Sequence, residues 1–170
     1  MTAVHWAVAR AQVVSLQALI AEGADIEARD EGQRTALHYA AARGHTALLD
    51  VLVSAGASLE AQTSNGVTAL QMAAEKAQTA TITALIKAGA NVNAASDTGR
   101  NTPLHAAILS HHVNALGSVQ ALLAAGSNVE AVNSEGKTAL MLAKEADDEE
   151  VVEAIQAALH KGHAGAKDEV

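Results

Sequence analysis

Cysteine is absent from the 170-residue sequence, so the chain has no disulfide, no thiolate nucleophile and no cysteine ligand for a metal. Phenylalanine is absent too, and aromatic residues make up only 1 % of the chain, although 49 % of its residues are hydrophobic. Such a chain has too few bulky rings to fill a thick central core. It can instead bury many thin seams between closely stacked helices, which is how repeat proteins are stabilised.

Targeting and membrane segments are also missing. The first residues contain neither a basic region nor an apolar stretch of the kind found in a signal peptide. No apolar run approaches the roughly 20 residues that a membrane span requires. The net charge of -8 argues against a nucleic-acid partner, because phosphate backbones repel an acidic surface. We therefore expect a cytoplasmic protein that binds neither nucleic acid nor membrane.

A short segment recurs along the whole chain. The segment Thr35–Ala41 reads Thr-Ala-Leu-His-Tyr-Ala-Ala, and related copies begin at Thr2, Thr68, Thr102 and Thr138. Each copy is followed by a second apolar helical segment. Four of these second segments end in a glycine, which favours the left-handed cap of a helix: Gly23, Gly56, Gly89 and Gly126. A period of about 33 residues with two helices per unit is typical of one class of helical repeat proteins.

The chain resembles the ankyrin-repeat family on these motifs, over roughly residues 2–160. The resemblance implies an all-α repeat solenoid of helix-turn-helix units joined by β-hairpin loops. We predict one domain over residues 1–160 and a disordered tail over 161–170. The expected repeats span approximately residues 2–29, 30–62, 63–95, 96–132 and 133–159.

Two repeats depart from this pattern. About three extra residues separate the helices of repeat four, within 110–118, and this insertion is either a tolerated loop or a binding loop. In repeat five, Lys144 and Gln156 replace apolar residues, and Leu159 replaces the terminal glycine. These polar replacements predict a C-terminal cap, because no further repeat would cover that side.

The eight histidines raise the question of a metal or catalytic site. His5, His38 and His105 each follow a helix-starting threonine by three residues, and the resemblance implies that they bond this threonine and backbone groups. His111 and His112 are adjacent, so they would point apart in a helix, whereas His160 and His163 are spaced as a zinc or nickel pair would be.

No plausible Ser-His-carboxylate triad and no glycine-rich phosphate loop accompany the histidines. We predict no enzyme, no cofactor and no metal site. A metal-binding or enzymatic role of the histidines remains the alternative that zinc and nickel titration would test.

Five residues occupy equivalent positions in the first helices. They are expected to line the seam between successive repeats rather than a ligand site: Trp6, Tyr39, Met72, Ala106 and Leu142.

The resemblance implies that a protein partner binds the concave face, formed by the hairpin tips and the outward side of each first helix. The positions that match this face and form our candidate site are Arg10, Arg29, Arg34, Arg43, Asn65, Val67, Lys76, Asn101, Leu109 and Lys137. Further residues that match this face are Glu31, Gln62, Ser64, Glu75, Ser110, Glu135 and Glu145.

Two features favour a protein interface there. The first two repeats contribute four arginines, and Val67 and Leu109 are apolar at positions expected to face water. We predict a monomeric, non-enzymatic binding module whose Arg10, Arg34 and Arg43 hold an acidic segment of a protein partner. The alternative is a regulatory or inhibitory subunit, or a delivery fragment of a larger enzyme or secreted effector. It is motivated by repeat one, which lacks the hairpin that in this family normally precedes the first helix.

Overall fold

Helix pairs follow one another along the whole molecule. The computed structural model describes the backbone of residues 1–110 and 115–165, and the side chains of these ranges as far as His160. The first helices of the pairs are α1 (Ala3–Ala9), α3 (Ala36–Arg43), α5 (Ala69–Glu75), α7 (Pro103–Leu109) and α9 (Ala139–Glu145). The second helices are α2 (Val13–Ala21), α4 (Thr46–Ser54), α6 (Thr79–Lys87), α8 (Ala115–Ala124) and α10 (Glu149–Gly165).

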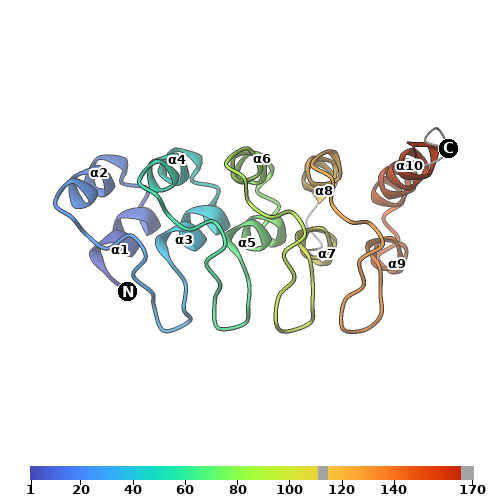
Figure 1. Cartoon of the computed structure of the whole chain (residues 1–170), viewed down its shortest axis with the longest axis horizontal. Helices are drawn as coiled ribbons and strands as arrows, with labels where there is room; N and C mark the ends of the chain where they lie inside the picture. The colour runs from blue at the N-terminus through green and yellow to red at the C-terminus, as the bar shows by residue number, and fades with distance from the viewer. Residues whose placement is uncertain (111–114, 166–170) are drawn as a thin grey trace.

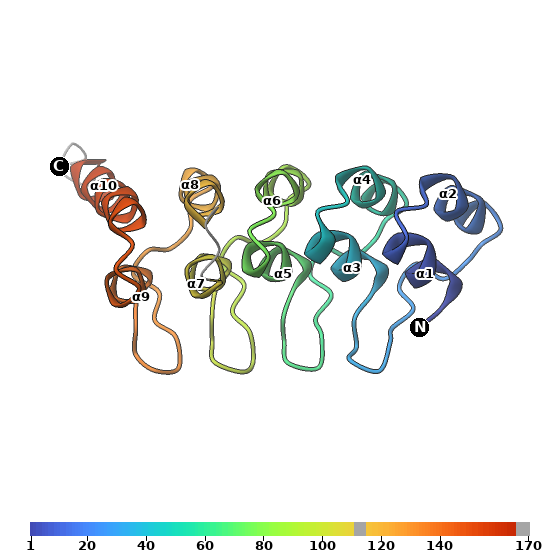
Figure 2. The same ribbon diagram turned by 180° about the vertical axis from the view of Figure 1, so that it is seen from behind.

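The helices form two rows. First helices lie side by side in one row and second helices in the other, and long loops project from the first row (Figures 1 and 2). The two termini lie at opposite ends of the array (Figure 1). This arrangement confirms the all-α repeat solenoid that the sequence predicts.

Threonine starts every first helix. Thr35 has an extended backbone with φ -90° and ψ 172°, and the helix begins at the next residue. Pro103 occupies the first helical position of α7, where its missing N–H removes no helical hydrogen bond. Glycine follows the second helices of the first four repeats, and Gly56, for instance, takes the left-handed conformation with φ +90°.

The core confirms the expectation of thin seams. Alanines of the first helices are completely buried between neighbouring repeats, as Ala40, Ala73, Ala107 and Ala143 show. Leucine and isoleucine of the second helices, such as Leu52 and Ile82, are equally buried between the two rows. Small residues let the first helices approach closely, so the array needs no large ring to exclude water.

The loops that project from the first row, which we call fingers, are held by hydrogen bonds rather than by named strands. Within the described residues the only β-type pairing is an isolated antiparallel bridge between Val132 and Thr138. Neighbouring fingers are joined by backbone bonds: Ser64 donates to the carbonyl of Gly32 at 3.0 Å, and Ser134 donates to that of Gly99 at 2.8 Å. The fingers therefore form a continuous row.

The last helix differs from the expected end of the chain. The backbone of α10 is helical to Gly165, so residues 161–165 continue the helix instead of beginning a disordered tail. Leu159 stands where other repeats have a left-handed glycine, so nothing stops the helix there. The rest of the predicted tail, 166–170, and the insertion residues 111–114 lie outside the described residues.

Candidate functional site

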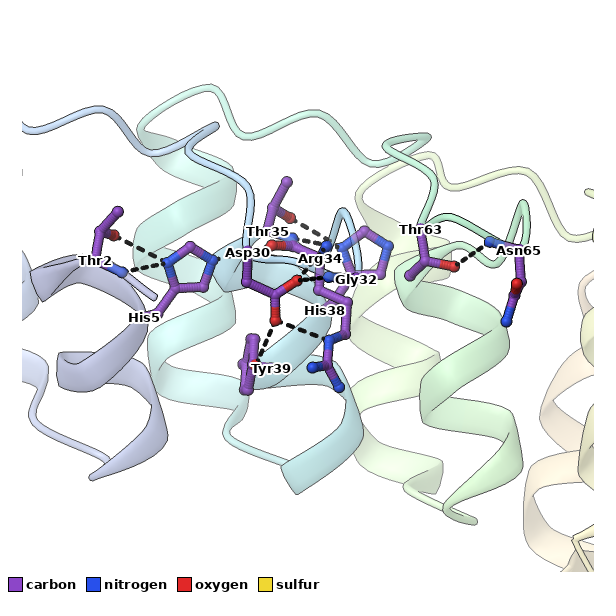
Figure 3. Close-up of polar contacts among 10 residues, drawn as sticks. All are labelled: Thr2, His5, Asp30, Gly32, Arg34, Thr35, His38, Tyr39, Thr63 and Asn65. Atoms are coloured by element: carbon purple, nitrogen blue, oxygen red, sulfur yellow. Dashed lines mark hydrogen bonds and ion pairs between the residues drawn. The ribbon is translucent and has the colours of Figure 1, made fainter.

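Buried histidines join consecutive repeats. The ring Nδ1 of His38 accepts a bond from the backbone N–H of Thr35 at 3.1 Å and lies 3.0 Å from the threonine hydroxyl. Its Nε2 lies 3.1 Å from the carbonyl of Val67 in the next finger (Figure 3 shows the threonine side). Because Nδ1 accepts, the tautomer that satisfies both sides carries its proton on Nε2 and donates it to that carbonyl.

The same bridge recurs along the array. His5 reaches the carbonyl of Arg34 at 3.0 Å, and His105 reaches that of Lys137 at 3.2 Å. Gln71 replaces the histidine in repeat three and forms both hydrogen bonds of the bridge. The Thr68 N–H donates to its Oε1, and its Nε2 donates to the carbonyl of Asn101. The structural role predicted for His5, His38 and His105 is confirmed.

Burial keeps two of the histidines neutral. Desolvation lowers the pKa of His38 and of His105 and outweighs the backbone hydrogen bonds, which act in the opposite direction. A neutral, fully bonded ring has no lone pair left for a metal or a substrate. Within the described residues, no group of three or more histidine, aspartate or glutamate side chains is placed to hold a metal ion.

Asp30 joins the finger of repeat two to its first helix. Its carboxylate is buried and accepts bonds from the backbone N–H groups of Gly32 and Arg34, the guanidinium of Arg34 and the hydroxyl of Tyr39 (Figure 3). Burial alone would raise the pKa of Asp30, but the bonds from Tyr39 and Arg34 and the charge of Arg34 outweigh it and lower the pKa to about 2. Asp30 is therefore ionised and paired with Arg34.

This pairing changes the role of Arg34. Its Nε lies 2.9 Å from Asp30 Oδ2, and its guanidinium lies 5.1 Å from the centre of the Tyr39 ring. The charge of Arg34 is thus largely balanced within the repeat. Of Arg10, Arg34 and Arg43, which were predicted to hold an acidic partner, Arg34 is therefore the least available.

Arg10 and Arg43 are exposed, as is Arg29, whereas Arg34 is half-buried. Arg43 donates from Nη1 to the carbonyl of Ala9 at 2.6 Å, so its guanidinium reaches the residue that precedes Arg10. Arg10 lies over the ring of Trp6, 5.3 Å from its centre, and Arg43 lies 5.9 Å from the centre of Tyr39. We call Arg10 and Arg43 the arginine pair. Each lies against an aromatic ring, and among the described residues neither forms an ion pair with a carboxylate.

A second feature of the face is a hollow of about 280 Å³ between repeats four and five. Leu109, which is 40 % exposed, and Leu142 give it an apolar surface. Its remaining lining residues are Gly99, Asn101, Asn133, Ser134, Glu135, Lys137, Glu145 and Ala146. Three predicted site residues, Asn101, Leu109 and Lys137, thus come together in one place, which we call the leucine hollow.

The one lysine of the leucine hollow is paired with two carboxylates, which leaves the hollow with one net negative charge. Lys137 Nζ lies 2.7 Å from Glu145 and 3.2 Å from Glu135, and these two hydrogen bonds raise its pKa. The side-chain oxygen of Asn101 accepts a bond from Asn133 at 3.3 Å. This end of the face therefore offers an apolar surface rimmed by paired charges.

The other predicted residues lie along the fingers, except Lys76, which follows the end of α5. Arg29 donates to the carbonyl of Gln62 at 2.9 Å and links two fingers, and Lys76 pairs with Glu75 at 2.8 Å. Val67 is half-buried, and its carbonyl is the acceptor for His38. Asn65 is exposed at a finger tip, where its backbone N–H donates to Thr63 (Figure 3).

The seam prediction is wrong for Trp6. Tyr39 is half-buried and packs edge-on against His5 of the preceding repeat, with ring centres 5.5 Å apart, and Leu142 is buried. Trp6 occupies the same position but is 51 % exposed, because repeat one has no described neighbour on that side.

Stacked two-helix units, joined by projecting fingers and linked by a histidine bridge, define a helical repeat solenoid that presents one long side-chain surface. A family model for ankyrin repeats matches the chain three times, at residues 4–96, 60–129 and 93–164. The chain therefore belongs to the ankyrin-repeat family, whose repeats are protein-protein interaction modules and are typically not enzymes. A search of curated proteins finds no match. Among the described residues, no helix is long and apolar enough to cross a membrane.

Proposed function

We propose that the protein is a non-enzymatic binding module whose concave face holds a protein partner. The supporting observation is the placement of the arginine pair, which is exposed and steadied on aromatic rings in an otherwise acidic protein. Guanidinium groups that are held in place lose less freedom on binding, and arginine is enriched where protein interfaces gain their energy. The partner segment that meets them is acidic.

The leucine hollow is the apolar part of the same interface. Leu109 and Leu142 would take an aliphatic side chain of the partner, while Asn101 and Lys137 border it. Because the fingers are bonded to one another, the face is ordered before binding, so little conformational entropy is lost when a partner docks. Val67 lies in sequence between the arginine pair and the leucine hollow. Its half-buried side chain adds to the contact surface on the fingers.

The test compares matched baits in affinity capture from the native source, read by mass spectrometry. The test variant is Arg10→Glu with Arg43→Glu; Arg34 is left intact because its charge supports Asp30. A partner retained by the wild type should be lost by this variant, with at least a tenfold fall in affinity and a weaker salt dependence.

The control carries the same change in charge elsewhere. Lys87 and Lys144 are exposed outside the arginine pair and the leucine hollow, so Lys87→Glu with Lys144→Glu should bind like the wild type. Equal retention of the partner by both double variants contradicts the arginine pair as the site. Equal loss in both would show that net charge, and not this face, drives binding.

A further inference from the structure

Most asparagine side chains of the array are held by hydrogen bonds. Asn133 is buried, and its side-chain oxygen accepts the backbone N–H groups of Glu135 at 2.9 Å and Lys137 at 3.0 Å. The side-chain oxygens of four more asparagines also accept a hydrogen bond: Asn91, Asn93, Asn101 and Asn128. Asn65 is different, because it is exposed at a finger tip and, within the described residues, only its backbone groups form hydrogen bonds (Figure 3).

The residue that follows Asn65 also sets it apart. Asn65 precedes Gly66, whereas every other asparagine in the chain precedes a residue with a Cβ atom. Glycine has no Cβ to hinder its backbone nitrogen, so that nitrogen can approach the side-chain carbon Cγ of the preceding asparagine. An unbonded amide and an unhindered nitrogen beside it are what an attack of the backbone on the side chain requires. Position 65 is the place in the described part of the chain where both occur together.

We propose that Asn65 is a site of spontaneous covalent modification that needs no enzyme. The backbone nitrogen of Gly66 gives its proton to water or hydroxide and forms a bond to Cγ of Asn65. The side-chain nitrogen takes up a proton and leaves as ammonia, so the product is a five-membered succinimide ring. No atom is oxidised or reduced in this step. The modification is independent of the concave-face function proposed above.

Hydrolysis of the ring gives two products. Water adds to one of the two ring carbonyls and breaks its bond to the nitrogen of Gly66. If the broken bond is the one to Cγ, the chain regains its normal course with an aspartate at position 65. If the broken bond is the one to the backbone carbon, the chain runs through Cγ and position 65 becomes isoaspartate. In both cases one water has been consumed and one ammonia released.

The finger slows this reaction but does not block it. The N–H of Gly66 donates to the carbonyl of Thr63 at 3.0 Å, so this bond must open before the nitrogen can attack. Opening of one turn at the tip of a finger costs much less free energy than unfolding of the array. We therefore expect the folded chain to react roughly tenfold more slowly than a free peptide of residues 60–70.

Modification of Asn65 would act on the contact between two fingers. Its backbone carbonyl accepts the N–H groups of Asp97 at 3.1 Å and Thr98 at 3.4 Å, in the finger of repeat four. In the isoaspartate product this carbonyl becomes part of a free carboxylate, and one more carbon enters the main chain of the finger. The aspartate product adds a negative charge near Asp97, whose carboxylate lies so close to Gly66 that a Cβ there would collide with it. Both products therefore weaken the row of fingers between repeats three and four.

The test follows the intact, folded chain during incubation for several weeks at about 37 °C and about pH 8, because asparagine is thermolabile and base favours loss of the backbone proton. Digestion at low pH and mass spectrometry then locate each lost amide, since its replacement by a carboxyl group adds about 1 Da. Isoaspartate is counted by its reaction with an isoaspartate-specific methyltransferase. We expect position 65 to react at least tenfold faster than Asn133 and to yield both products. Equal rates at the two positions, or no reaction at position 65 over this time, overturn the proposal.

Two variants connect the chemistry to the fingers. Asn65→Gln keeps an amide but needs a larger ring, which closes far more slowly, so this variant should lose no ammonia at position 65. The fold should be unchanged, because the side chain is exposed. Amide hydrogen exchange of residues 97–98 should become faster in the aged wild type and in fresh Asn65→Asp, and stay unchanged in aged Asn65→Gln. Exchange that increases equally in aged Asn65→Gln, or in none of the three, overturns the proposed effect on the fingers.

Discussion

A single buried hydroxyl shows how a repeat position tolerates a polar residue. Thr81 is completely buried on the side of α6 that faces the preceding repeat, and its Oγ1 has no hydrogen-bond partner among the described residues. Leu48 and Val151 fill the same position with apolar groups, whereas Ser118 at this position lies 3.0 Å from Thr79 Oγ1. The cost of Thr81 therefore comes from its desolvated hydroxyl and not from its volume.

We expect Thr81→Val to stabilise the protein by about 1 kcal/mol, because it removes an unsatisfied hydroxyl and keeps the shape of the side chain. Thermal and urea unfolding monitored by circular dichroism measure the change. Thr68→Val is the matched control: Thr68 Oγ1 accepts from Gln71 N–H at 3.4 Å at the start of α5, so its loss should destabilise by about 1 kcal/mol. Destabilisation by Thr81→Val would show that its hydroxyl has a partner.

At the scale of the element, the helix pair depends on a neutral ring at the start of its first helix. His38 and His105 each join their own threonine to the next finger, and burial lowers their pKa below the unfolded value of about 6.5. As the pH falls, these two histidines therefore bind protons in the unfolded chain before they do so in the folded chain. The contribution of these two histidines to the free energy of unfolding is therefore fully present above about pH 6.5, and it falls as the pH decreases towards their folded pKa.

We expect His38→Gln with His105→Gln to reduce this loss of stability between pH 7.5 and pH 5. Gln71 already forms the same two bonds in repeat three, so glutamine can replace the ring without its titration. The measurement is the free energy of unfolding in urea at both pH values. An unchanged difference between the two values in the variant would assign the acid sensitivity to other groups.

At the scale of the whole molecule, stability is distributed along a line. Each repeat contacts only its neighbours, so the inner repeats gain from two seams and the end repeats from one. Repeat three lies between α3 and α7, and its Ala73 and Ala74 are completely buried. Repeat one lacks a cover over Trp6, and repeat five exposes Met141, which is 51 % exposed where the histidine bridge would continue.

We expect amide hydrogen exchange to be slowest in α5 and clearly faster in α1 and α10 at micromolar concentration. Mass spectrometry after digestion measures it. Uniform protection over all repeats would mean that the array opens as one unit.

Much of the fold could be predicted from the sequence because the repeat is local. Thr35 starts a helix, Gly56 follows the next helix, and His38 lies one turn after its threonine; all of these act within a few residues. The repeating alanines predicted thin seams for the same reason. The candidate face could be predicted as a set of positions, but not as a set of contacts.

The remaining features depend on what lies beside each residue. Arg34 and Arg43 look alike in the sequence, yet one is paired with Asp30 and the other reaches Ala9 in the preceding repeat. Leu109 and Leu142 are 33 residues apart and meet only because repeats stack. The continuation of α10 to Gly165 also escaped prediction, because helix ends are set by small local free energies.

The sequence by itself determined the repeat, its helix starts and stops and its bridging histidines, because backbone conformation and capping act between residues close along the chain. Only the tertiary structure decided which arginines remain exposed, where the leucine hollow forms and that Trp6 lies open to water. Burial and charge pairing depend on neighbours about one repeat away, and a repeat at the end of an array has such neighbours on one side only.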